Sequence, residues 1–430
     1  MKNLYYYTML VVLISQFGCV PPKLMNSFPS VKQAQLPSPA EPATTSWVKL
    51  QSNAELIVVE LDNEGEFYGS EQRGFALERV KYLANNKQAL RVVFFIHGWD
   101  HNAFQLDSNR QHFQNLICSM AAAPDSTDPY WIGVYIGWRG KVVNSSLLSW
   151  ATFYDRKAAA VRAGGLPLSL FLGQMGEAVH ASVGKDHIAV AVGHSFGARV
   201  LERAYLPSLA VPNSKPLLDL VFLLNPATEA LQAKIAMDVL SLRLQAGETF
   251  ASPLLVCIAS DSDQDTGKLF PSATWIPALF HNFQDDDEYK KNNNTEIKIK
   301  QGELWRFTAP YSDTIITHDV KSLSEVNDWS RLPKSDVIPL WFNNENQNSN
   351  LPPEKILIAR TPATGNKPYL LDSPYWIFKV PSEFSFDHSD IFRPPLIHLI
   401  TTIIRRQLNN RQYNSVHKAT QGSSFANPSN

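Results

Sequence analysis

Short apolar runs and longer helix-like stretches alternate along most of this chain. An apolar run of about four to eight residues fits one buried strand and is too short for a helix. Such runs occur at 55–60, 91–96, 131–138, 188–192, 218–225, 253–260 and 375–380. Helix-like stretches separate or follow them at 71–86, 103–122, 166–183, 198 onward, 227–244 and 396–408. This alternation predicts an α/β fold, with a mostly parallel central sheet and helices on both of its faces.

The alternation stops between 274 and 374. Acidic or asparagine-rich runs occur there, at 285–288, 292–294 and 343–350. A long irregular segment inside a compact domain is typical of a surface insertion. We therefore predict a polar insertion with short strands, such as the runs at 296–299 and 356–359.

The N-terminus has the pattern of an export signal. Lys2 precedes an apolar stretch over 4–17, which ends at Gly18 and Cys19. A charged start, a short apolar run and a small residue are typical of a signal peptide. The segment resembles a bacterial lipoprotein signal in which Cys19 is lipidated, although Gln16 and Phe17 depart from that pattern. An uncleaved anchor is the alternative, but the apolar run is short for a membrane span.

These features divide the chain into four parts. We predict a signal peptide over 1–19, a flexible tether over 20–50, one globular domain over 51–408 and a polar, disordered tail over 409–430. The signal places the protein in the bacterial cell envelope, either anchored to a membrane or free in the periplasm or outside the cell.

Composition adds few constraints. The 430 residues include 39 basic and 40 acidic side chains, and this balance indicates no nucleic-acid partner. Hydrophobic residues make up 44% of the chain and charged residues 18%, as in ordinary globular proteins. Cys118 and Cys257 have no metal-like spacing, and we expect both in the core, with a disulfide between them left open.

The most informative stretch follows the apolar run at 188–192. Gly193-His194-Ser195-Phe196-Gly197 separates this predicted strand from a predicted helix. Strand, G-x-S-x-G and helix together are the context of a nucleophile elbow, a turn so tight that glycine is needed two positions before and after the serine. Ser195 is therefore the candidate nucleophile.

A nucleophilic serine needs a base and an acid to orient that base. In a parallel sheet, both should lie in loops at the carboxyl ends of strands. The strand that ends at Ser260 is followed by Asp261, Asp263 and Asp265, and the last strand is followed by His388. The spacing alone leaves the three aspartates open as the acid, and we expect His318 and His398 to have other roles.

Another strand ends at His97-Gly98-Trp99. A glycine there lets the backbone come close, so the Trp99 N–H, together with the Phe196 N–H, would form an oxyanion hole. The alternative is a metal site at His97, Asp100 and His101. No third cluster completes such a site, so we expect no metal.

These residues together resemble the α/β-hydrolase superfamily of serine hydrolases, over about 55–408 without the insertion. Phe95–Ala103, with Asp107 and Asn109, and the elbow are similar to uncharacterised bacterial hydrolases that carry an HGWxHNA loop. Their acid loop commonly reads S-E-N-D-W-A-T-G, which aligns with 260–267 and selects Asp263, with Asp265 as the fallback. Their histidine loop reads H-x-D-I, which is matched from His388 onward.

The resemblance implies a serine esterase of the α/β-hydrolase fold that needs no cofactor. Ser195 would attack a small-molecule or lipid ester, His388 would act as base, Asp263 would orient it, and the amides of Trp99 and Phe196 would hold the oxyanion. A peptidase, a thioesterase or a non-catalytic binding lipoprotein are the alternatives. Aromatic residues just before the irregular stretch 139–165 and within it would line an acyl pocket or only pack the crossover: Trp138, Trp150, Phe153 and Tyr154.

Overall fold

The structure, a computed structural model, describes residues 46–123, 128–142, 152–182, 184–250, 253–278, 285–290, 296–322, 325, 337–340, 355–360 and 373–423. The predicted signal peptide, Cys19, Trp150 and the asparagine-rich runs at 292–294 and 343–350 lie outside these residues. The chain divides into two compact units, Met1–Thr228 and Glu229–Asn430.

The first unit is built on a mostly parallel sheet, as the sequence predicts. The strands, in spatial order, are β1 (Trp47–Gln51), β2 (Ala54–Glu60), β4 (Tyr130–Gly137), β3 (Ala89–Ile96), β5 (Asp186–His194) and β6 (Leu220–Leu224). Only the pairing of β1 with β2 is antiparallel, and the other neighbours in this unit run parallel. The apolar runs therefore become strands that are buried on both faces.

Helices cover both faces of this sheet. They are α2 (Ser70–Asn86), α3 (Ser108–Ala122), α5 (Phe153–Ala163), α6 (Leu166–His180) and α7 (Phe196–Leu209). A Cβ on Gly133 of β4 would contact Phe113 and Ile117 of α3. Arg79 of α2 instead forms hydrogen bonds with Glu55 of β2. Successive side chains of a strand point to opposite faces of the sheet, and the neighbours of Glu55 in β2 face α3. The helix α2 therefore covers the face opposite to α3.

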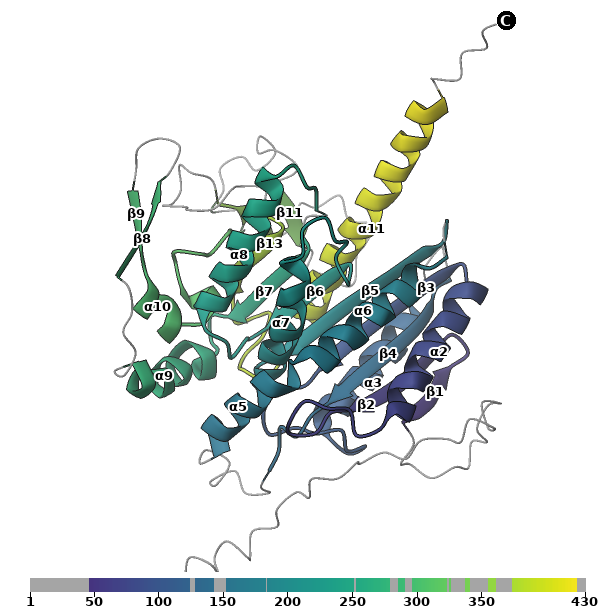
Figure 1. Ribbon diagram of the computed structural model, residues 1–430, viewed down its shortest axis with the longest axis horizontal. Coiled ribbons are helices and arrows are strands. Elements are labelled where there is room, and N and C mark those ends of the chain that lie inside the picture. The colour runs from purple at the N-terminus through teal and green to yellow at the C-terminus, as the bar shows by residue number, and fades with distance from the viewer. Residues whose placement is uncertain are drawn as a thin grey trace, which may run out of the picture. The chain divides into compact units, whose positions relative to one another are not determined.

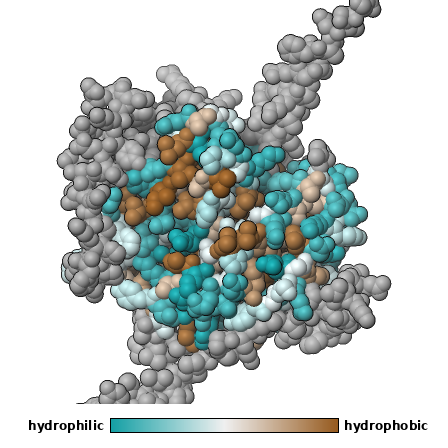
Figure 2. Space-filling model, viewed as in Figure 1, coloured by the Kyte–Doolittle hydropathy of each residue, from teal (hydrophilic) through white to brown (hydrophobic). Residues whose placement is uncertain are grey.

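On the face of α2, the helices α2, α6 and α7 lie side by side (Figure 1). Brown apolar atoms interrupt the polar ones on this side of the molecule (Figure 2), and the exposed large apolar side chains of α6 are Leu166 and Leu170.

The second unit contains the parallel pair β7 (Leu255–Ser260) and β13 (Tyr375–Val380), with Cys257 opposite Ile377. Its helices are α8 (Ala230–Gln245), α9 (Phe270–Ala278), α10 (Gln301–Arg306) and α11 (Pro394–Ser423), with short turns at Asp265–Leu269 and Ala309–Tyr311. The remaining strands are β8 (Asp285–Lys290), β9 (Glu296–Lys300), β10 (His318–Ser322), β11 (Val337–Leu340) and β12 (Lys355–Ala359).

The predicted insertion is more regular than its composition suggests. The expected strands at 296–299 and 356–359 are confirmed as parts of β9 and β12. β9 pairs with β8, and β12 is the centre of an antiparallel sheet with β10 and β11. β8 and β9 are close in sequence, whereas the sheet of β10, β11 and β12 joins more distant segments, which no local pattern reveals.

Three boundary predictions are wrong. β1 lies inside the expected tether, because Trp47 is buried and its strand pairs with β2. α5 occupies part of the stretch expected to be irregular. The last helix continues to Ser423, well into the expected disordered tail, since no glycine or proline interrupts the sequence between Pro395 and Gly422.

The helix expected from Ala103 begins at Ser108. Asp107 caps it, since its carboxylate accepts hydrogen bonds from the Asn109 and Arg110 amides.

Cys118 and Cys257 are free thiols, and only Cys257 is fully buried. Among the described residues, no helix combines the length and apolar character needed to cross a membrane.

Candidate active site

Ser195 is the single residue between β5 and α7. Its backbone has φ 55° and ψ −121°, a conformation that residues other than glycine rarely adopt. The Ser195 N–H donates to the Leu224 carbonyl at 3.0 Å, and the Ser195 carbonyl accepts from the Ala227 N–H at 3.2 Å. The strained turn is thus fixed by the end of β6 and the loop that follows it. Strain of this kind costs about 1–3 kcal/mol and is concentrated at functional sites.

The two elbow glycines are required by close approach. A Cβ on Gly193 would lie 2.7 Å from the Ala198 Cα, and a Cβ on Gly197 would lie 2.1 Å from the Ile96 carbonyl oxygen. Both distances are too short for any side chain. The spacing of the elbow motif therefore has a steric cause in this structure.

The loop after β3 packs directly against the elbow. A Cβ on Gly98 would lie 2.9 Å from the Ser195 Cβ and 3.1 Å from the His194 Nδ1. The structure therefore brings the predicted oxyanion loop and the predicted nucleophile together. Phe196, whose amide is the second predicted donor, is the first residue of α7. The first N–H groups of a helix have no acceptor within that helix.

His97 holds this loop through hydrogen bonds to the backbone. Its Nδ1–H donates to the Gly98 carbonyl at 2.9 Å, and its Nε2 accepts from the Trp138 N–H at 3.1 Å. The Trp138 ring stacks on the His97 ring at 5.8 Å, and its Nε1–H donates to the His97 carbonyl at 2.8 Å. Burial lowers the pKa of His97 to about 4, so this imidazole is neutral. Trp138 is thereby placed as a packing residue of the loop.

The other members of the alternative metal site are used differently. His101 Nδ1 lies 3.2 Å from the Asp107 carboxylate, and its Nε2 lies 2.7 Å from the Asn109 Nδ2. Burial would raise the pKa of Asp107, but the interactions with His101 outweigh it and lower that pKa. Asp100 faces Lys141 at 3.7 Å. In the described residues, no group of three or more His, Cys, Asp and Glu side chains could hold a metal ion.

Among the described residues, three of the five non-glycine residues with positive φ follow the carboxyl ends of neighbouring strands of this sheet. Asp100 has φ 64°, Ser195 φ 55° and Asn225 φ 41°. These residues follow the ends of β3, β5 and β6, which are neighbours in the sheet. Sequence reasoning missed Asn225, although an asparagine directly after a buried strand is a signal, since asparagine tolerates positive φ.

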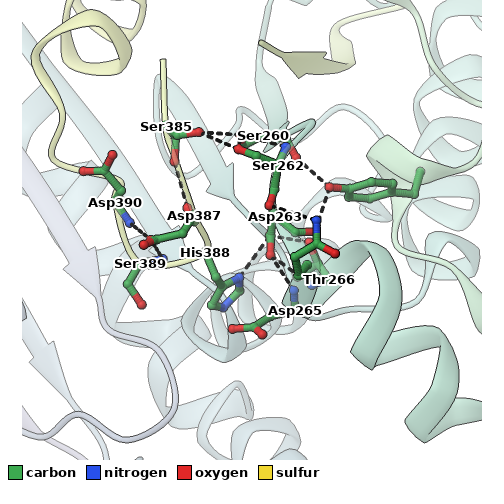
Figure 3. Close-up of polar contacts among 12 residues, drawn as sticks. Ser260, Ser262, Asp263, Asp265, Thr266, Ser385, Asp387, His388, Ser389 and Asp390 are labelled. Carbon is green, nitrogen blue, oxygen red and sulfur yellow. Dashed lines mark hydrogen bonds and ion pairs between the residues drawn. The ribbon is translucent and has the colours of Figure 1, made fainter. Parts of the chain in front are cut away.

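In the second unit, Asp263 and His388 form a hydrogen-bonded pair (Figure 3). His388 Nδ1 lies 3.0 Å from the Asp263 Oδ2. The other carboxylate oxygen accepts from the Asp265 N–H at 2.9 Å and the Thr266 N–H at 3.1 Å. The Thr266 hydroxyl donates to Oδ2. The Asp263 side chain is fully buried, whereas that of His388 is 15% exposed.

The charges of the pair stabilise each other. Burial would raise the pKa of Asp263, but the hydrogen bond and charge of His388 and the Thr266 donors outweigh it and lower that pKa. Burial would lower the pKa of His388, but the hydrogen bond and charge of Asp263, together with the charges of Asp265 and Asp387, raise it. An imidazole with a raised pKa is a stronger base, and its protonated form is stabilised.

The loops that carry this pair are fastened to each other. The Ser260 and Ser262 hydroxyls donate to the Ser385 carbonyl at 2.5 and 3.0 Å (Figure 3). The Tyr311 hydroxyl donates to the carbonyls of Ser260 and Asp263 at 2.5 and 3.0 Å. Sequence reasoning missed Ser385, Tyr311 and Thr266. For Thr266 a signal existed, since an aspartate three residues before a threonine is typical of a side-chain-capped turn.

The other aspartates and histidines considered for the acid and the base have different surroundings. Asp265 is exposed, and Asp261 lies 3.4 Å from the Lys379 ammonium. His318 is buried, with its Nδ1 2.8 Å from the Thr317 hydroxyl and its ring 4.4 Å from that of Trp376. His398 is part-buried in α11, and burial lowers its pKa.

The chain is thus an α/β protein with a mostly parallel sheet, which carries a strained serine turn in its first unit and a histidine–aspartate pair in its second. Comparison of the chain with protein-family models, with curated proteins and with solved structures found no match.

Proposed function

We propose that this protein has the α/β-hydrolase fold and is a serine hydrolase that cleaves carboxylic esters. The observation that carries this proposal is the strained backbone of Ser195, held directly against Gly98 of the neighbouring loop. A serine in a strand-to-helix turn of this kind, beside a glycine that lets backbone amides approach, suits attack on a carbonyl carbon.

We propose that Ser195, His388 and Asp263 act as one triad. With Nδ1 bonded to Asp263, His388 has Nε2 to accept the Ser195 hydroxyl proton. The serine oxygen bonds to the carbonyl carbon, and the carbonyl electron pair moves to its oxygen, held by the Trp99 and Phe196 amides. Collapse of this intermediate expels the alcohol, which takes the proton from His388. Water then releases the acid by the same steps, so no cofactor takes part.

Labelling by a fluorophosphonate and turnover of p-nitrophenyl butyrate test the proposal. We expect the wild type to do both and Ser195→Ala to do neither. Ser119→Ala is the matched control, because this exposed serine lies on α3 and its hydroxyl donates to the Asn115 carbonyl of its own helix. Undiminished labelling of Ser195→Ala would overturn the assignment. A wild type that neither labels nor turns over esters would favour the non-catalytic binding protein, and turnover of thioesters or peptides alone would favour the other two alternatives.

We propose further that the protein is exported and anchored to a membrane through a lipid on Cys19. The support is the charged start, short apolar run and Gly18-Cys19 pair of the sequence. In a bacterial expression host fed labelled fatty acid, the wild type should gain the label and Cys19→Ser should not. Equal labelling of the two would contradict the anchor.

A further inference from the structure

Three aromatic side chains form a cluster beside the elbow. The Phe153 ring lies 5.3 Å from that of Phe196 and 5.7 Å from that of Trp99, and the last two rings lie 6.2 Å apart. Trp99 and Phe196 are the residues whose amides form the proposed oxyanion hole. The Phe153 ring therefore lies next to the two residues whose amides are proposed to hold the oxyanion.

The cluster extends from the buried elbow to the surface. Phe196 is 1% exposed, Phe153 8% and Tyr154 51%. The Tyr154 ring stands edge to face against Phe153 at 5.4 Å. Packing of the crossover between β4 and α6 accounts for Phe153, which is buried. The Tyr154 ring, in contrast, has about half of its surface exposed to solvent.

The helix that carries this aromatic pair is firmly held. The buried Arg156 guanidinium donates to the Arg139 carbonyl at 2.6 Å and to the Asn63 side chain at 2.9 Å. At the far end of α5, a Cβ on Gly164 would lie 2.5 Å from the Val200 carbonyl oxygen of α7. Phe153 and Tyr154 are thus presented by a fixed element, which is what a specificity site requires.

We infer that the acyl group of the substrate is apolar and packs on Phe153 and Tyr154; this inference rests on the proposed function. The acyl group stays bonded to Ser195 after the alcohol has left with the proton from His388. Side chains grouped with Ser195 in its own unit therefore contact the acyl group in both halves of the reaction. Aromatic surface at that point favours hydrocarbon over a short or charged acyl group.

A series of p-nitrophenyl esters from acetate to hexanoate tests this inference. Each methylene removed from water favours binding by roughly fourfold, so partial burial should make kcat/KM for hexanoate about tenfold or more above that for acetate. We expect Tyr154→Ala to reduce this ratio by roughly threefold or more, and Phe153→Leu to reduce it as well. Tyr82→Ala is the control, because Tyr82 is also an exposed aromatic side chain but lies on α2.

Labelling of Ser195 by a fluorophosphonate separates the two possible failures. If the wild type is labelled but its ester series is flat, or if Tyr154→Ala keeps the wild-type ratio, the acyl assignment is overturned and the esterase stands. If Ser195 is not labelled, both are overturned.

Discussion

Gly98 lies so close to Ser195 that a Cβ added to the glycine would come within 2.9 Å of the Cβ of the serine. The backbone after β3 and the turn after β5 therefore meet at a point where no side chain fits between them. Trp99, whose amide is a proposed oxyanion donor, is the next residue of this loop.

Gly98→Ala should reduce kcat because the added methyl group forces the loop away from Ser195. Loss of one oxyanion donor costs about 10²- to 10³-fold in kcat, and we expect a reduction of this size with a smaller change in KM. Gly74→Ala is the matched control, because a Cβ there meets nothing within 4 Å. Wild-type kcat in folded Gly98→Ala protein would contradict the role of this loop.

Asp263→Asn should lower kcat on the order of 10⁴-fold, because the amide no longer orients His388 or stabilises its protonated form. Asp265→Asn should retain most of the activity, since Asp265 is exposed and contacts Asp263 through its backbone N–H. Steady-state kinetics on one ester measure both. A larger loss in Asp265→Asn than in Asp263→Asn would make Asp265 the acid.

The pH dependence of kcat/KM should show the raised pKa of His388. In the proposed triad, His388 acts as the base only when neutral, so activity should fall as the pH drops through a pKa that lies above the ordinary value of 6.5. In Asp263→Asn, burial is no longer opposed by the carboxylate, so the acid limb of the residual activity should move to lower pH. An acid limb at the same pH in both proteins would show that His388 does not govern it.

His97 should make the free energy of unfolding fall in mild acid. Its pKa is lowered from 6.5 to about 4 by burial, so below pH 6.5 the unfolded chain binds a proton that the folded chain does not. This stability is present above pH 6.5 and is lost progressively down to about pH 4.

Urea unfolding of the wild type and His97→Asn at about pH 7 and about pH 5 measures this effect. The stability advantage of the wild type should shrink by about 2 kcal/mol at the lower pH. A constant difference between the two proteins would mean that the pKa of His97 is not lowered by burial.

The elbow could be located from the sequence because its motif is local, with Gly193, Ser195 and Gly197 in one turn between a strand and a helix. The close approach at Gly193 involves nearby Ala198, whereas that at Gly197 involves the Ile96 carbonyl of β3, which the sequence alone does not show. The main strands were found for a similar reason, since each is a short apolar run buried on both faces.

The pairing of Asp263 with His388 could not be derived from spacing, because 125 positions separate them. Three aspartates share the loop, and only the tertiary structure buries one and exposes its neighbour Asp265. The contacts of Ser385 and Tyr311 were missed for the same reason, since they join loops that are distant in sequence. β1 was missed because its five residues follow a proline-rich stretch and become a strand only by pairing with β2.

The proposed activation of Ser195 by His388 is measured most directly by the rate at which a fluorophosphonate labels Ser195 at neutral pH. Removal of a general base costs about 10²- to 10⁴-fold, so labelling of His388→Ala should be slower than that of the wild type by this factor. Mass spectrometry should find the label on Ser195 in both proteins. An equal labelling rate in His388→Ala, or a label on another residue, would contradict the triad.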